Sequence, residues 1–143
     1  MDAQDPYELS RFVEAQDRGD TYAHARDELR AGRKTSHWMW FVFPQVAGLG
    51  LSAMSRRYAV GSRAEARAYL AHPVLGPRLR EVAGIVAATR DRTVEQVFGS
   101  VDALKLHSSM TLFAQADPDE PVFREVLERL FDGRPDPETL RRL

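Results

Sequence analysis

The chain has 143 residues, a length that fits one domain with its own hydrophobic core. Hydrophobic residues make up 43% and charged residues 29%, and the net charge is −1, so no overall positive charge attracts nucleic acid or an anionic membrane. The absence of cysteine excludes disulfides, thiolate metal ligands and cysteine nucleophiles. Residues 1–5 are acidic and polar, unlike a signal peptide. We expect a cytoplasmic single domain over residues 1–143, with residues 1–5 as a loose tail.

Helix start and stop signals recur along the whole chain. Ser62-Arg63-Ala64-Glu65 and Thr93-Val94-Glu95-Gln96 are capping-box patterns, and glycine follows several apolar-periodic segments. The predicted helices run from Asp5-Pro6 to Gly19, from Asp20 to Ala31, from Ser52 to Tyr58, from Ser62 to the break at His72-Pro73, from Pro77 through Val86, from Thr93 to Phe98-Gly99, from Asp102 to Ala114, from Pro121 to Phe131, and onward from Asp136-Pro137. With no hairpin signal and no repeat, the sequence predicts an all-α, single compact multi-helical domain.

A dense aromatic segment lies near the middle of the first half. Residues 36–44 hold both tryptophans and two of the seven phenylalanines. The stretch from Trp38 to Phe43 is too short to span a bilayer, so we expect a central, largely buried element and no membrane association. It is predicted as a helix capped by Thr35 or Ser36, with a strand as the alternative, because aromatic and β-branched residues favour extended structure.

The polar residues before this segment form a first candidate site. Free helical N–H groups together with Arg33, Lys34 and His37 suit a phosphate or carboxylate, and Trp38 or Trp40 could stack on a ring. The alternative is a capped core helix preceded by solvated basic residues. Acids on the amphipathic helices, such as Glu28, are expected on solvated faces.

A second candidate site lies in residues 105–111. On a helix Lys105, Ser108 and Ser109 share one face, where a lysine beside hydroxyls could bind phosphate. Alternatively, these hydroxyls simply bond back to the preceding carbonyl groups. The four histidines are far apart in sequence and lack metal-binding spacing, so we expect neither a metal site nor a cofactor.

Five stretches of the chain together resemble one known family. They are residues 30–34, 36–45, 48–50, 68–79 and 104–113. With them the chain resembles the bacterial family catalogued as domain of unknown function 1810, some of whose members carry the label "calpastatin", which nothing in this sequence supports. The resemblance implies a compact, mainly α-helical fold, as in the family's mycobacterial member, and no established reaction.

The leading hypothesis joins the two candidate sites into one pocket for a small anionic, nucleotide-like ligand. Its predicted lining is Arg33, Lys34, Ser36, His37, Trp38, Trp40, Lys105 and Ser109. If the pocket is catalytic, His37 would act as general acid or base and Lys105 would stabilise charge, in hydrolysis of a nucleotide-related or N-glycosidic bond. The rival hypothesis is a non-enzymatic protein-interaction module. Sequence-specific nucleic-acid binding is not expected, and the oligomeric state is left open.

Overall fold

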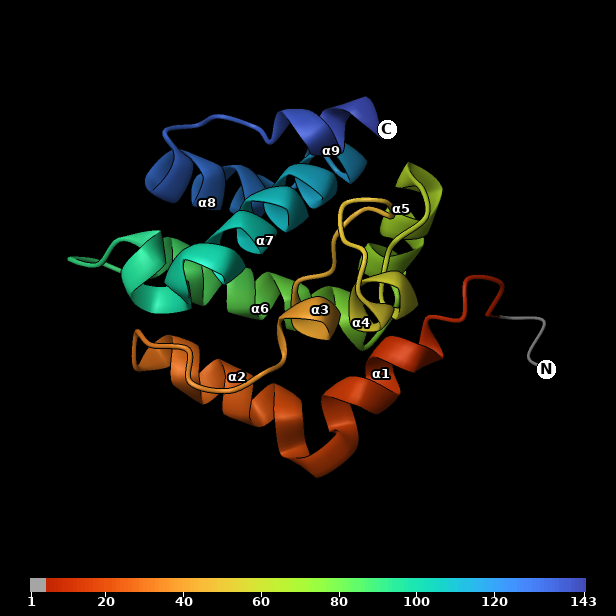
Figure 1. The fold of residues 1–143 in the computed structure, drawn as a ribbon, viewed down its shortest axis with the longest axis horizontal. Helices are drawn as coiled ribbons and strands as arrows, with labels where there is room; N and C mark the ends of the chain where they lie inside the picture. Colours follow the sequence, from red (N-terminus) through yellow and green to blue (C-terminus); the bar gives the residue numbers. More distant parts are fainter. Residues whose placement is uncertain (1–4) are drawn as a thin grey trace.

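The computed structural model describes residues 5–143, which form helices joined by short turns (Figure 1). The elements are α1 (Ser10–Asp17), a 3-10 turn η1 (Arg18–Asp20), α2 (Thr21–Arg30), α3 (Met39–Val42), α4 (Ala53–Arg57), α5 (Arg63–Ala71), α6 (Leu75–Ala88), α7 (Val94–Ala116), α8 (Pro121–Phe131) and α9 (Pro137–Arg141). The extended pairing within this range is one isolated parallel bridge between Val46 and Val60. The all-α prediction is confirmed.

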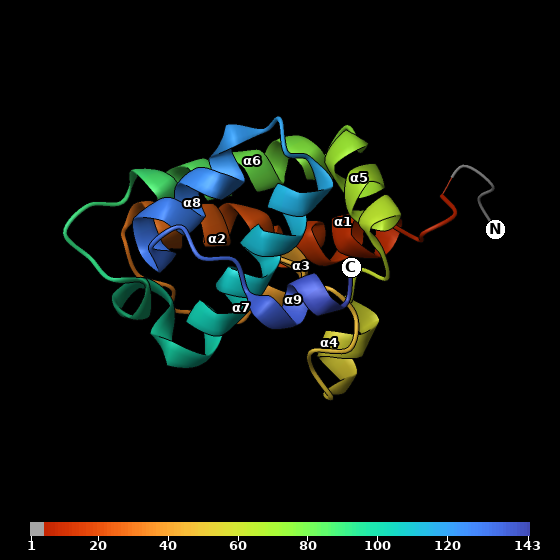
Figure 2. The ribbon, with the colours of Figure 1, turned by 90° about the horizontal axis from the view of Figure 1, so that it is seen from above.

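Helix α6 runs through the middle of the molecule. It packs against α2 on one side and α8 on the other, and α7 packs against α5, α8 and α9. Figures 1 and 2 show α1 and α2 at one side of α6, α7 to α9 at the other, and the short α3 between them. The segment from α3 to α5 carries α4, and its residues Val46, Tyr58 and Val60 are buried in the same core.

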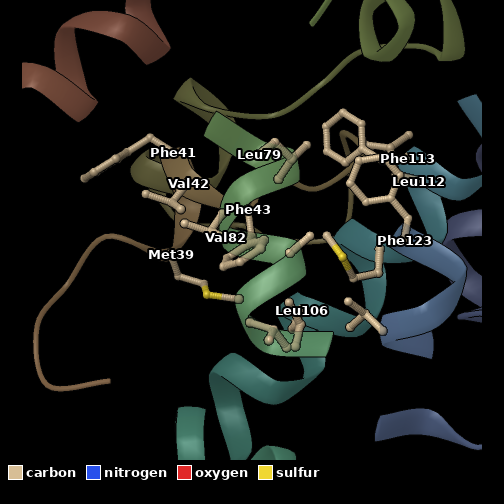
Figure 3. Packing of buried hydrophobic residues seen from close by; sticks show 14 of the residues in the cluster. Met39, Phe41, Val42, Phe43, Leu79, Val82, Leu106, Leu112, Phe113 and Phe123 are labelled. Atoms are coloured by element: carbon tan, nitrogen blue, oxygen red, sulfur yellow. The ribbon is translucent and has the colours of Figure 1, made fainter. Parts of the chain in front are cut away.

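The aromatic segment is central and buried, as expected. Trp38 and Phe43 expose 1% and 0% of their surface, and both rings lie edge-on to Phe98 of α7. Residues of α3, α6, α7 and α8 share this cluster (Figure 3). Trp40, in contrast, is only partly buried. The segment is helical, as predicted, but the helix is a single turn.

Several predicted caps are confirmed. Ser52, Thr93 and Asp136 each accept a backbone N–H at the start of a helix, and Thr93 and Gln96 form a complete capping box. In the other predicted box, the Ser62 side chain accepts the N–H of Glu65 as expected. The carboxylate of Glu65 instead accepts the N–H of Gly61, so only half of that box forms.

Other predicted boundaries are wrong. The first helix begins at Ser10 and not at Pro6, because the Asp5 carboxylate accepts the N–H groups of Leu9 and Ser10 and makes a preceding turn. Residue 5 is therefore tied to α1, whereas the rest of the expected tail, residues 1–4, lies outside the described residues. Neither Thr35 nor Ser36 caps α3, because the N-cap residue is Trp38 and it makes no side-chain cap hydrogen bond.

The two helices predicted at residues 93–98 and 102–114 are joined in one element, α7. The joint is Gly99, whose φ of +80° and ψ of 162° are not helical. A φ in this range is accessible to glycine without the steric cost that a side chain would add. Gly99 therefore turns the chain so that the second half of α7, which carries Lys105, starts in a new direction.

Candidate functional site

Glu28 on α2 holds the loop that leads into α3. Its carboxylate accepts the N–H of Thr35 at 2.7 Å, the N–H and hydroxyl of Ser36, and the indole N–H of Trp38 at 3.0 Å. Burial raises the pKa of Glu28, but these hydrogen bonds outweigh it and hold the pKa at about 2. The expectation that Glu28 lies on a solvated face is wrong, because it fixes the first candidate segment.

Asp102 joins the two candidate segments. Its carboxylate accepts the ammonium of Lys34 at 2.8 Å and that of Lys105 at 3.1 Å. Lys34 also donates to the carbonyl of Ser36 at 2.6 Å. Burial raises the pKa of Asp102, and the bonds from the two lysines outweigh it, so the pKa lies below its ordinary value. The segments therefore meet through a shared ionised carboxylate. The two ammonium groups and this carboxylate together carry a net charge of +1.

Each of these lysines also lies over one of the two tryptophans. The ammonium of Lys34 is 4.9 Å from the ring centroid of Trp38, and that of Lys105 is 4.3 Å from that of Trp40. Lys34 and Lys105 are the only lysines of the chain, its other basic residues being arginine. A lysine ammonium is a compact charge with three donors, so Lys34 contacts the Asp102 carboxylate, the Ser36 carbonyl and the Trp38 ring together. The restriction of lysine to these two positions is visible in the sequence and is a signal that links the two segments.

A groove opens beside Trp40, between the 45–55 loop and the kinked part of α7. We call it the Trp40 groove, and it has a volume of about 300 Å³. It is lined by Trp40, Gln45, Leu49, Gly50, Leu51, Ser52, Ser55, Val101, Leu104 and Lys105. A Cβ at Gly50 would lie 2.5 Å from the Ser55 hydroxyl, so a glycine is needed for the loop to lie this close to α4. The groove contains two of the predicted site residues, Trp40 and Lys105.

The other predicted site residues lie elsewhere. Arg33 and His37 are exposed, and within residues 5–143 His37 has no hydrogen-bond partner. Trp38 is in the core with its N–H bonded, so its ring is closed to a ligand. The Ser109 hydroxyl is fully buried and lacks a partner among the described residues. These residues do not line the Trp40 groove, so one pocket holding the whole predicted set is not formed.

The polar residues that follow Lys105 hold the C-terminal segment. The ring of His107 stacks on Phe131 at 4.3 Å between ring centroids and donates through Nε2 to the carbonyl of Arg134 at 2.7 Å. The Thr111 hydroxyl accepts the N–H of Asp136, and the Ser108 hydroxyl donates to the Asp136 carboxylate. Ser108 and Thr111 also donate to the carbonyls four residues before them, as in the structural alternative. Ser108 and Thr111 of the second candidate site, together with His107, therefore stabilise the fold.

Two further features, a metal centre and a membrane-spanning helix, are absent from the residues that the structure describes. No cluster of three or more histidine, aspartate or glutamate side chains there is arranged to hold a metal ion. No helix in that range is both long enough and apolar enough to cross a membrane. The Trp40 groove is the candidate site that residues of both candidate segments, Trp40 and Lys105, line.

The comparisons with known proteins place the chain in a family. The chain belongs to the family described as "Protein of unknown function (DUF1810)", whose model matches residues 6–143. It is also similar to the conserved hypothetical protein Rv1873 from Mycobacterium tuberculosis, with 49% sequence identity and a TM-score of 0.94 over 97% of this chain and 98% of that one. No curated protein matches the chain. The comparisons thus confirm the family and the fold of the chain.

Proposed function

We propose that the protein binds a small anionic ligand with a flat apolar ring, such as a nucleotide-like compound, in the Trp40 groove. The observation that carries the proposal is the convergence of Lys105 and Trp40 on one groove, with Asp102 and Lys34 fixing the lysine from behind. The groove volume of about 300 Å³ lies at the lower end of the range for small-molecule sites.

The lining suits the two parts of such a ligand. Leu49, Leu51 and Leu104 offer apolar surface to a ring, and the indole of Trp40 is only partly buried beside them. The Lys105 side chain remains 21% exposed, so its ammonium can reach an anionic group. Because one carboxylate is shared by two lysines, positive charge remains to attract that group.

The geometry supports binding more strongly than catalysis. The predicted acid or base, His37, is exposed and does not line the groove. A general base needs a group that orients it and hydrogen-bond reach to the substrate, and His37 has no such partner within the described part of the chain. Lys105, the predicted electrostatic residue, does line the groove, and in the proposal it binds the anion.

A thermal-shift screen with nucleotides, sugar phosphates and ADP-ribose tests the proposal. A ligand present at 100 times its dissociation constant adds about 2.7 kcal/mol to stability, which is a shift of several degrees. Each hit is then titrated calorimetrically into the parent protein and into Lys105→Met, which removes the charge and keeps the stem. The loss of one charge-assisted hydrogen bond should weaken binding by about 1.5–3 kcal/mol.

Two matched variants complete the test. Leu104 is 69% exposed, so Leu104→Ser should weaken ligand binding while leaving the melting temperature nearly unchanged. Arg124 is exposed on α8 and far in sequence from the groove residues, so Arg124→Met controls for loss of one positive charge. A panel without any hit, or hits that Lys105→Met and Leu104→Ser bind as tightly as the parent, would contradict the proposal.

A protein partner is the second candidate, favoured by the apolar rim of the same groove. Leu51, Val101 and Leu104 are 81%, 65% and 69% exposed, and exposed apolar residues grouped around a groove suit an interface. Leu104→Ser should abolish binding of a protein partner at this place. Lys105→Met should weaken that binding less than it weakens binding of a small anion. The ratio of the two effects separates the candidates.

A further inference from the structure

A second hollow lies where the C-terminal ends of α2 and α6 meet. It has a volume of about 370 Å³ and is lined by Leu29, Arg30, Ala31, Gly32, Ile85, Ala88, Thr89, Arg90 and Arg92. We propose that this arginine hollow is a binding site for a phosphate group that carries two negative charges, as in a phosphomonoester or a diphosphate.

Charge distinguishes the arginine hollow from the other hollows of the described chain. Three arginines line it and no carboxylate does, whereas acids accompany the basic residues in the hollows near Arg11 and Arg129. One of the three, Arg90, also lines the hollow near Arg129, together with Glu125 and Glu128, whereas Arg30 and Arg92 line the arginine hollow alone. Within residues 5–143 neither Arg30 nor Arg92 forms an ion pair. In the Trp40 groove, by comparison, Lys105 is already paired with a carboxylate.

The negative ends of the two helices offset only part of this positive charge. Arg90 donates to the carbonyls of Ala87 and Thr89 at the end of α6, at 3.2 and 3.4 Å, so one arginine caps a helix. Each helix C-terminus carries roughly −0.5 charge, so the two ends offset about one arginine, the role that Arg90 fills. Arg30 and Arg92 then leave a surplus of about two positive charges. That surplus corresponds to a doubly charged anion.

The turn after α2 is shaped to admit an arginine side chain. Gly32 has a φ of +78°, and a Cβ there would lie 3.0 Å from Nε of Arg92 and 3.1 Å from its Cδ. The guanidinium of Arg92 therefore lies directly against a backbone without a side chain, at the edge of the hollow. Asp91, the adjacent acid, is exposed and does not line the hollow.

Arginine is the side chain suited to this ligand. A planar guanidinium offers parallel N–H donors that match two phosphate oxygens, and it stays charged at any physiological pH. Three guanidinium groups around one small hollow can bind a phosphate from several directions. The site uses different residues from the Trp40 groove, so it does not depend on the proposed function of that groove.

Calorimetric titration with pyrophosphate at low salt tests the arginine hollow. The double variant Arg30→Gln/Arg92→Gln should weaken binding at least tenfold and remain folded, because both side chains are exposed. The matched control, Arg63→Gln/Arg124→Gln, removes two other exposed arginines that form no ion pair within the described residues, and it should bind like the parent. Lys105→Met should also leave pyrophosphate binding unchanged.

Sedimentation with phosphatidate vesicles, against phosphatidylcholine vesicles, identifies the source of the phosphate. Co-sedimentation that only the Arg30→Gln/Arg92→Gln variant loses assigns the site to a lipid headgroup, and soluble binding alone assigns it to a free phosphate compound. No binding of either kind, or an equal loss in the two double variants, would overturn the proposal.

Discussion

Glu28 shows how much one side chain can fix. Two backbone N–H groups, a hydroxyl and an indole N–H all donate to it, so a single carboxylate sets the path of the chain between α2 and α3. This role could not be predicted from the sequence. Glu28 lies on an amphipathic helix like many solvated acids, and its partners are brought to it only by the turn after α2.

Replacing Glu28 by Gln should destabilise the protein in a pH-dependent way. The loss should be about 2 kcal/mol at neutral pH, because bonds to a charged acceptor are worth more than bonds to an amide. The pKa of Glu28 falls from 4.5 to about 2 on folding, so its contribution is full above pH 4.5 and is lost as the pH falls towards 2. Urea unfolding of parent and variant from pH 7 to pH 2 measures the difference.

The control for this measurement is Glu125→Gln on α8. The Glu125 side chain is exposed and forms no hydrogen bond or ion pair within the described residues. It should leave stability within about 0.5 kcal/mol of the parent at each pH. A difference between parent and Glu28→Gln that stays constant down to pH 2 would show that the carboxylate charge is not what holds the loop.

At the scale of elements, the segment around α3 contains one aromatic residue that belongs to the core and another that lines the candidate site. Phe43 is fully buried between Trp38 and Phe98, so Phe43→Ala should cost about 3–5 kcal/mol, as core cavities do. Trp40 is also an aromatic residue of this segment, but it is only partly buried. Trp40→Ala should therefore cost clearly less, about 1–2 kcal/mol, in proportion to the apolar area it covers.

Denaturant unfolding of the two α3 variants measures this difference directly. The control is Phe131→Ala, because Phe131 on α8 is, like Trp40, an aromatic residue that is partly buried and packed against the core, and its loss should be closer to that of Trp40→Ala than to that of Phe43→Ala. Equal losses of unfolding free energy for Phe43→Ala and Trp40→Ala would mean that Trp40 belongs to the core as fully as Phe43 does. Trp40 would then not form an accessible wall of the groove.

At the scale of the whole molecule, the fold was predictable because it rests on local signals. Caps such as Ser52 and Thr93 and the amphipathic pattern of α8 act within a few residues, and sequence records them fully. The boundary errors arose where the backbone departs from a regular helix, although the residues responsible are local. Asp5 closes a turn before α1, and Gly99 permits α7 to continue through a kink.

The candidate site was predictable in part for the same reason. The sequence singled out the segments that contain Trp40 and Lys105, and these do lie together. It did not identify Asp102 as the group that joins them, because Lys34 and Asp102 are far apart along the chain. It also could not separate the buried Trp38 from the accessible Trp40, which are two residues apart on one short turn.

Ligand titration followed at the two tryptophan indole N–H signals tests the Trp40 groove most directly. The chain has two tryptophans, so a nitrogen–proton correlation spectrum contains two such signals, and Trp40→Phe assigns them. Saturation with a ligand found in the screen should move the Trp40 signal and leave that of Trp38, whose N–H is bonded to Glu28. Lys105→Met should need a higher ligand concentration for the same change. A saturating ligand that moves neither signal, or that moves Trp38 alone, would contradict binding in the Trp40 groove.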